Sequence, residues 1–123
     1  MIKLVIKGQI RGGKNNIGIT RTGRHYPHPE FVRWREDVCR QITSQWPHLY
    51  YGKIKIEIPC IVTISYWAGD KRRRDVPAMI DALWHVFERG AFVADDSLFK
   101  TVHWIDCGYD KTNPRVKIEI EEL

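Results

Sequence analysis

One amphipathic segment between two charged stretches constrains this chain more than any other feature. From Val76 to Arg89, apolar residues recur at the spacing of one face of an α-helix. Asp75 occupies the expected N-cap, Pro77 falls in the first turn, and Gly90 is expected to close the helix. The apolar positions are Val76, Met79, Ile80, Leu83 and Phe87, and the polar side carries Asp81, His85 and Glu88. The sequence therefore predicts a helix that packs against a core along one side.

The charged stretches on either side of this helix suggest a site for an anionic substrate and a metal ion. Lys71-Arg72-Arg73-Arg74 leads into Asp75, and Asp95-Asp96 follows the helix after a short turn. Basic side chains and a helix N-terminus attract phosphate, whereas clustered carboxylates bind hard divalent cations such as Mg²⁺. If the helix packs on the strand that follows, Asp75 should converge with Asp95 and Asp96, an arrangement suited to metal-assisted phosphodiester hydrolysis. The alternative is a solvated run of charge beside an unrelated loop.

Alternating apolar residues predict strands before, between and after two helices. The strands are expected at 2–6, 54–66, 98–105 and 116–120. Pro59 should bend the second strand, because proline cannot donate to a ladder. A second helix is expected to begin at Pro29 and to end before Pro47. The order β-loop-α-β-α-β-β predicts one α/β (α+β) domain over residues 1–123, a two-layer fold with a four-stranded mixed sheet and two helices on one face.

Charge and cysteine content narrow the class of protein. The net charge is +5, and residues 1–40 hold nine Lys and Arg against three Asp and Glu. Because no basic amphipathic helix is present, this surplus favours nucleic acid over a membrane as partner. No apolar run approaches the ~20 residues of a membrane span, so we expect no membrane association and a cytoplasmic location. Cys39, Cys60 and Cys107 match neither a zinc site nor a disulfide framework and are expected to be reduced thiols.

A glycine-rich stretch from Gly8 to Pro29 is expected to follow a phosphate backbone. It contains five of the nine glycines and lacks strong periodicity, which is typical of functional or mobile segments. A small hairpin is expected within it, with Ile17–Thr20 and Arg24–Tyr26 on either side of a turn at Gly23. The nucleic-acid-binding residues predicted here are Lys14, Asn15, Asn16, Arg21 and Arg24, in addition to Lys71, Arg72, Arg73 and Arg74. A surface loop without function is the alternative.

Several of these residues together resemble the RusA family of crossover-junction endodeoxyribonucleases. The most specific part of the resemblance is the succession Arg72-Arg73-Arg74-Asp75, Ala82-Leu83, Gly90-Ala91-Phe92-Val93 and Asp95-Asp96. Asn15-Asn16 after the first strand and Trp34-Arg35 on the first helix extend it over nearly the whole chain. The resemblance implies small α/β subunits that work as a homodimer, depend on Mg²⁺ (or Mn²⁺) and make paired nicks in branched DNA, namely four-way (Holliday) junctions. Many members of this family are encoded by phages and prophages.

The resemblance also implies roles for single residues. Asp75 and Asp96 match catalytic acids of the family, and Asp95 matches the acid beside the second one. All three are expected to bind the metal ion. The chain departs from the family pattern at Pro77 and Ala78, where the family commonly has Asp and Asn.

A second departure is Asp81, which occupies the place of a functional lysine in the family. Asp81 lies one helical turn beyond Pro77, so we expect it to supply the missing coordination as a catalytic residue, with His85 orienting it. This interpretation predicts a rearranged but active nuclease. The alternatives are a non-catalytic DNA- or RNA-binding module derived from such a nuclease, and a nuclease for flaps or other branched DNA.

Overall fold

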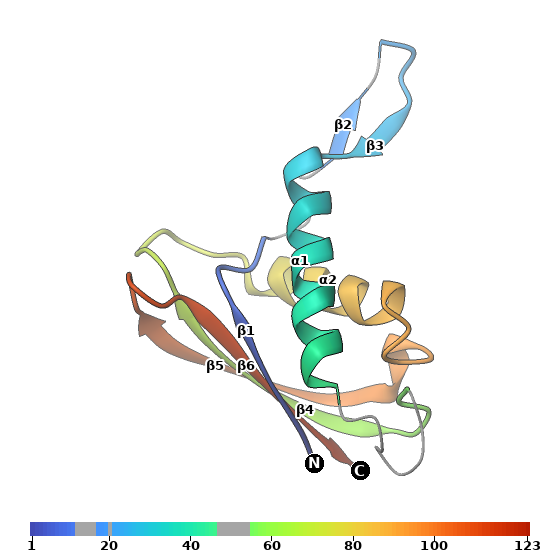
Figure 1. Cartoon of the computed structure of the whole chain (residues 1–123), viewed down its shortest axis with the longest axis vertical. Helices are drawn as coiled ribbons and strands as arrows, with labels where there is room; N and C mark the ends of the chain where they lie inside the picture. Colours follow the sequence, from blue (N-terminus) through green and yellow to red (C-terminus); the bar gives the residue numbers. More distant parts are fainter. Residues whose placement is uncertain (12–16, 20, 47–54) are drawn as a thin grey trace.

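The computed structural model describes residues 1–11, 17–19, 21–46 and 55–123. Its elements in chain order are β1 (Ile2–Lys7), β2 (Ile17–Ile19), β3 (His25–Pro27), α1 (Pro29–Gln45), β4 (Cys60–Ala68), α2 (Val76–Arg89), the 3₁₀ turn η2 (Asp96–Leu98), β5 (Phe99–Tyr109) and β6 (Arg115–Glu122). Figure 1 shows the sheet on one side of both helices, with the β2–β3 hairpin beyond the end of α1. The chain termini lie together at one end of the sheet, where β1 begins and β6 ends.

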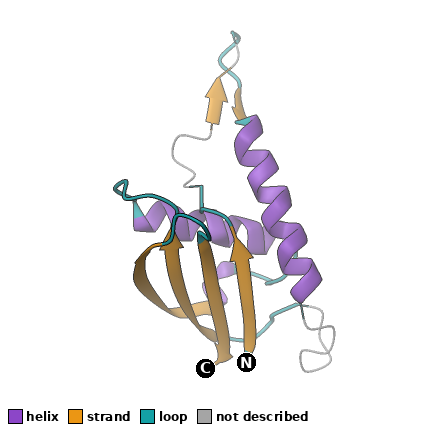
Figure 2. Ribbon diagram, turned by 60° about the vertical axis from the view of Figure 1, so that its left-hand side comes forward, coloured by secondary structure: helices purple, strands orange, loops and turns teal. Residues whose placement is uncertain are grey.

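The main sheet has four strands in the order β1-β6-β4-β5. β6 is antiparallel to both β1 and β4, whereas β4 and β5 are parallel, so the sheet is mixed. Both helices cover the same face of this sheet (Figure 2). The predicted two-layer fold is therefore confirmed, as is the small hairpin, in which β2 pairs with β3.

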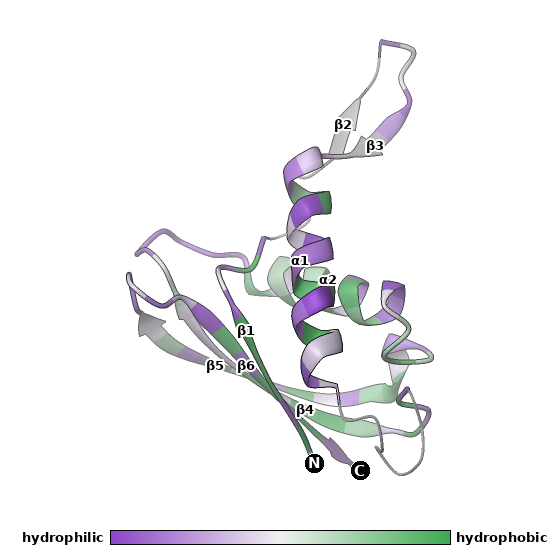
Figure 3. Ribbon diagram, in the orientation of Figure 1, coloured by the Kyte–Doolittle hydropathy of each residue, from purple (hydrophilic) through white to green (hydrophobic). Residues whose placement is uncertain are grey.

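The core lies between the sheet and the two helices. Every second residue of β1, β4 and β6 is buried, and the buried positions are in register across the sheet, as in the row Leu4, Ile118 and Ile64. Aromatic rings fill the space beneath α2, where Phe87 lies 5.7 Å from Phe99, centroid to centroid. In Figure 3 α1 carries both hydrophobic and hydrophilic residues along its length, as expected for a helix with one buried side.

Two glutamines of α1 protect the outer edge of the sheet. The backbone N–H of Val5 donates to Gln45 Oε1 at 2.8 Å, and Gln45 Nε2 donates back to the Val5 carbonyl at 2.7 Å. Gln41 makes the same reciprocal pair with Lys7. Open strand edges invite pairing with other chains. The side chains of α1 therefore satisfy β1 where a further strand would otherwise bind.

The predicted helix over 76–89 is confirmed residue for residue as α2. Asp75 caps it, because Asp75 Oδ1 accepts the backbone N–H of Ala78 at 3.2 Å. Gly90 is the C-cap, but its φ of −79° is open to any residue. The left-handed residue is Ala91, with φ of 58°, and Phe92 N–H donates to the Phe87 carbonyl across the turn. Glycine is needed at position 90 because an added Cβ would collide with the Phe92 ring.

Two strand predictions need correction. The strand expected at 54–66 begins only at Cys60, and Ile56 forms an isolated bridge with Val93 instead, because Pro59 breaks the ladder. The strand expected at 98–105 runs from Phe99 to Tyr109, because Leu98 belongs to the 3₁₀ turn η2 that precedes it. Its partner β4 provides a parallel edge for that whole length. None of the helices in the described part of the chain is long and apolar enough to span a bilayer.

The turn after α2 predicts opposite effects for two neighbouring substitutions. Ala91→Gly should raise the free energy of unfolding by about 1 kcal/mol, because a left-handed φ strains any residue with a Cβ. Gly90→Ala should lower it by about 1–3 kcal/mol, because the new methyl group overpacks against Phe92. Urea denaturation of the two variants beside the wild type measures both changes. Equal and small effects would contradict this account of the turn.

Candidate functional site

The topology of one β-α-β unit decides where the charged residues lie. Since β4 and β5 are parallel, α2 must run back along them from the end of β4 to the start of β5. Asp75 therefore lies at one end of the unit and Asp95 and Asp96 at the other. The 14-residue helix that separates them is about 20 Å long at ~1.5 Å per residue. The expectation that Asp75 converges with Asp95 and Asp96 is wrong within one chain.

A different carboxylate joins Asp95 and Asp96. Glu88, in the last turn of α2, places a carboxylate oxygen within 4.8 Å of oxygens of both aspartates. We call Glu88, Asp95 and Asp96 the acidic triad. Glu88 and Asp95 are exposed and Asp96 is half-buried, so the triad is open to solvent. Glu88 lies on the predicted polar side of the helix, and the sequence indicated no role for it.

The backbone around the triad is fixed by the core. Phe92 and Val93 are buried, and Ile56 binds this turn from both sides, its N–H donating to the Phe92 carbonyl and its carbonyl accepting from Ala94 N–H. The chain then reaches Asp95, whose Oδ1 accepts the Ser97 N–H at 2.8 Å. The Asp96 N–H donates to Glu88 Oε1 at 3.3 Å. The turn thus returns the chain to the last turn of α2, in range of Glu88.

The electrostatics of the triad suit a cation. The Asp96 carboxyl group, by sharing a hydrogen bond with Glu88 and by repelling its negative charge, raises the pKa of Glu88 above its ordinary value. The Ser97 backbone N–H and hydroxyl lower the pKa of Asp95, so Asp95 keeps its negative charge. Carboxylate oxygens are the ligands that Mg²⁺ and Mn²⁺ prefer. The triad therefore fits a hard divalent ion, which would replace repulsion between the carboxylates with attraction.

The opposite end of the unit carries the basic loop, Lys71 to Arg74. Arg74 Nη2 binds Asp70 Oδ1 at 2.6 Å and also Gln9 Oε1, so this arginine anchors the loop. Asp70 also accepts the Arg72 N–H at 2.9 Å, and this bond, with the Arg74 contacts, lowers the pKa of Asp70. Lys71, Arg72 and Arg73 are exposed. Of the four predicted phosphate contacts, three thus face solvent and the fourth holds the loop in place.

The remaining predicted residues belong to the glycine-rich stretch. Lys14, Asn15 and Asn16 fall outside the described residues. Arg21 and Arg24 are exposed at the turn of the β2–β3 hairpin.

Asp81 and His85 also differ from expectation. Asp81 is exposed midway along α2, roughly 10 Å along the axis from Glu88, and is not part of the triad. His85 lies against α1, with Nε2 3.2 Å from Arg35 Nη1 and its ring 5.8 Å from the Phe31 ring. Burial and the positive charge of Arg35 lower the pKa of His85, which favours the neutral imidazole. Glu88, rather than Asp81, completes the group of carboxylates.

No protein-family model matches this chain, and no curated protein is significantly similar to it. The resemblance to the RusA family therefore rests on the motifs themselves.

Proposed function

We propose that this chain is a metal-dependent endonuclease that hydrolyses phosphodiester bonds in branched DNA and resolves four-way junctions by paired nicks. The observation that carries the proposal is the acidic triad, three mutually close carboxylates on a chain whose net charge is +5. A basic protein has no need to gather acids in order to bind DNA, because each carboxylate repels the phosphate backbone. Binding of Mg²⁺ or Mn²⁺ would explain why these acids lie together.

The triad residues would have different roles in binding the ion. Glu88 and Asp96 lie on opposite sides of the turn after α2 and would hold the ion between them, while Ser97 orients the Asp95 carboxylate. When bound, the ion polarises a phosphoryl oxygen and lowers the pKa of a bound water. The triad is open to solvent, so an extended DNA strand has access to it.

The basic loop would hold the substrate away from the point of cutting. Lys71, Arg72 and Arg73 present mobile or forked donors to phosphate, which gives affinity without sequence preference. The length of α2 separates the loop from the triad by about 20 Å, or about six nucleotides of one strand at ~3.4 Å each. A DNA substrate also agrees with a bacterial cytoplasmic location, in a host or a phage-infected cell.

A binding module without catalysis is the second candidate. The presence of Pro77 and Ala78, where the resemblance implies Asp and Asn, favours it, because these residues carry no metal ligand on their side chains. Such a module would use the same basic loop and would not need a divalent ion. A nuclease for flaps or other branched DNA shares the proposed chemistry and differs in substrate alone.

Cleavage of labelled four-way, flap and duplex DNA tests the proposal. The wild type should cut the four-way junction only with Mg²⁺ or Mn²⁺. Glu88→Gln and Asp96→Asn should each slow cutting by roughly 100-fold or more, a barrier increase of about 2.7 kcal/mol. Both variants should still bind the junction, because they remove charges that repel DNA.

Asp81→Asn is the matched control for these variants, because it neutralises an exposed acid on the same helix outside the triad. It should cut like the wild type. Junction binding without metal-dependent cutting in the wild type would refute the nuclease and leave the binding module. Preferred cutting of flaps would correct the substrate and keep the chemistry.

We also propose that the enzyme is a homodimer, since the described residues of one chain form one acidic triad and paired nicks require two. Within one chain Asp75 is too far from the triad to act with it, but in a two-fold dimer it can lie close to the triad of the second copy. If the α2 helices of two copies lie antiparallel, the Asp75 end of one helix faces the Glu88 end of the other. Asp75 of one copy would then act with the triad of its partner.

Mixing two impaired variants tests this shared site. Asp75→Asn, which keeps a good N-cap residue, and Asp96→Asn should each cut roughly 100-fold or more slower than the wild type when alone. A mixed dimer would contain one site with an intact Asp75 and an intact triad, so mixing should restore single nicks in the junction. Full activity of Asp75→Asn alone, or a mixture that stays as slow as either variant, would contradict the shared site.

A further inference from the structure

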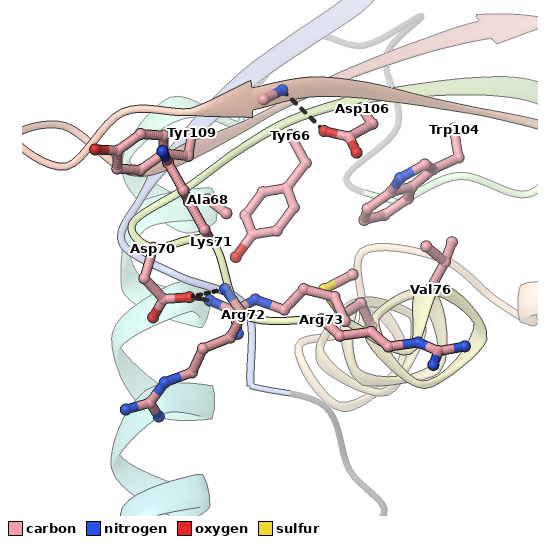
Figure 4. A pocket seen from close by; sticks show the side chains of 13 residues that line it. Tyr66, Ala68, Asp70, Lys71, Arg72, Arg73, Val76, Trp104, Asp106 and Tyr109 are labelled. Atoms are coloured by element: carbon pink, nitrogen blue, oxygen red, sulfur yellow. Dashed lines mark hydrogen bonds and ion pairs between the residues drawn. The ribbon is translucent and has the colours of Figure 1, made fainter.

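A hollow of about 380 Å³ opens beside the basic loop, at the end of the β4–α2–β5 unit opposite the triad. In open sheets with parallel strands, ligands bind in the crevice outside the carboxyl ends of the strands, and this hollow lies there. Figure 4 shows Tyr66, Trp104 and Asp106 on its sheet side and the Arg72–Arg73 segment across from them. Its volume falls within the ~300–1,000 Å³ of sites that bury one small ligand.

The sheet register brings aromatic side chains into this hollow. Ile64 pairs with Trp104 and Tyr66 with Asp106, so Trp104 and Asp106 share the helix-covered face of the sheet. α2 begins only at Val76, and β5 is an edge strand, so Trp104 keeps part of its surface open. The Tyr66 ring lies 5.8 Å from Trp104, edge to face, and is buried beneath it.

The aromatic groups are held in place by neighbouring polar contacts. Tyr66 Oη accepts the Ile10 N–H at 3.2 Å, which fixes the floor of the hollow. Tyr109 is 47% exposed at the mouth, with Lys71 Nζ 5.3 Å from its ring centroid. Asp106 Oδ1 accepts the Gly108 N–H at 2.8 Å, and in Figure 4 its carboxylate lies above the gap between the Tyr66 and Trp104 rings.

This combination of groups matches the parts of a nucleotide. Planar aromatic faces stack on nucleobases of any kind, and a fixed carboxylate accepts hydrogen bonds from a base amino group. Arginine forks bind phosphate through paired hydrogen bonds, and Arg72 and Arg73 are exposed on the other wall. A paired base cannot use the hollow, because its faces are already stacked in the duplex.

Building on the proposed function, we propose that the hollow binds one unpaired nucleotide of branched DNA. The base lies against Trp104 and Tyr109, and its phosphate lies on Arg72 and Arg73. Such a nucleotide occurs where strands exchange or separate, so the hollow distinguishes a branch point from plain duplex. The protein would thereby read DNA branching at one end of α2 and cut at the other.

Binding without a divalent ion tests the hollow independently of cleavage. The probe is a duplex with a single-nucleotide bulge, compared by fluorescence anisotropy with the same duplex carrying an abasic nucleotide at the bulge. The wild type should bind the bulged base more tightly by roughly 5- to 150-fold, the effect of one stacked base. Trp104→Leu should abolish this preference and leave binding of the abasic probe unchanged.

Trp67→Leu is the matched control. Trp67 is the neighbour of Tyr66 on β4 and stacks on Arg115, at 4.0 Å, on the opposite face of the sheet. It should keep the preference. Tyr109→Leu removes the exposed ring at the mouth and serves as a second variant whose folding does not depend on the core. Circular dichroism of each variant checks the fold.

The possible outcomes distinguish the proposal for the hollow from the proposal that the protein is a nuclease. Equal affinity of the wild type for both probes overturns the hollow, whatever the cleavage assay shows. A base preference that survives both Trp104→Leu and Tyr109→Leu overturns it as well. A preference lost in these variants, in a protein that never cuts with Mg²⁺, supports the hollow and refutes the nuclease. If a free deoxynucleoside monophosphate competes for the hollow as well as the bulged DNA does, the natural ligand is a free nucleotide and the proposal of branched DNA is wrong.

Discussion

The parallel pairing of β4 with β5 is the constraint on which the rest of the structure depends. It forces α2 to run the length of the sheet and return the chain to the start of β5. The same connection places the basic loop at one end of the helix and the acidic triad at the other. The proposed phosphate contacts and the proposed metal site are therefore separated by the length of a helix, so their opposite charges do not neutralise each other.

The hydrophobic core makes this separation rigid. Phe87 and Phe92 hold the turn after α2 from within, and the bridge between Ile56 and Val93 holds it from the side. The triad is therefore carried by the backbone of a packed turn rather than by a free loop. At the other end, Arg74 donates hydrogen bonds to Asp70 and Gln9. The shape of the basic loop therefore depends on one of its own cations.

Sequence reasoning succeeded where the cause is local and failed where it is topological. The limits of α2 follow from Asp75, Pro77 and Gly90, which act within one turn, and both were predicted correctly. The two-layer fold followed from hydrophobic periodicity. The prediction that Asp75 converges with Asp96 was wrong, because neither strand's own sequence indicates the direction of β5 relative to β4. Glu88 was missed because its partners reach it only after the chain reverses at Ala91; a search for acids flanking that reversal would have found it.

We propose that Glu88, Asp95 and Asp96 bind a divalent ion. Isothermal titration of the DNA-free protein with Mn²⁺ tests it most directly, with Asp81→Asn as the control acid on the same helix. We predict one ion per chain in the wild type and in Asp81→Asn, and affinity weaker by about tenfold or more in Glu88→Gln, a difference of at least ~1.4 kcal/mol. Unchanged Mn²⁺ affinity in Glu88→Gln, or a loss that follows Asp81 instead, would contradict the account.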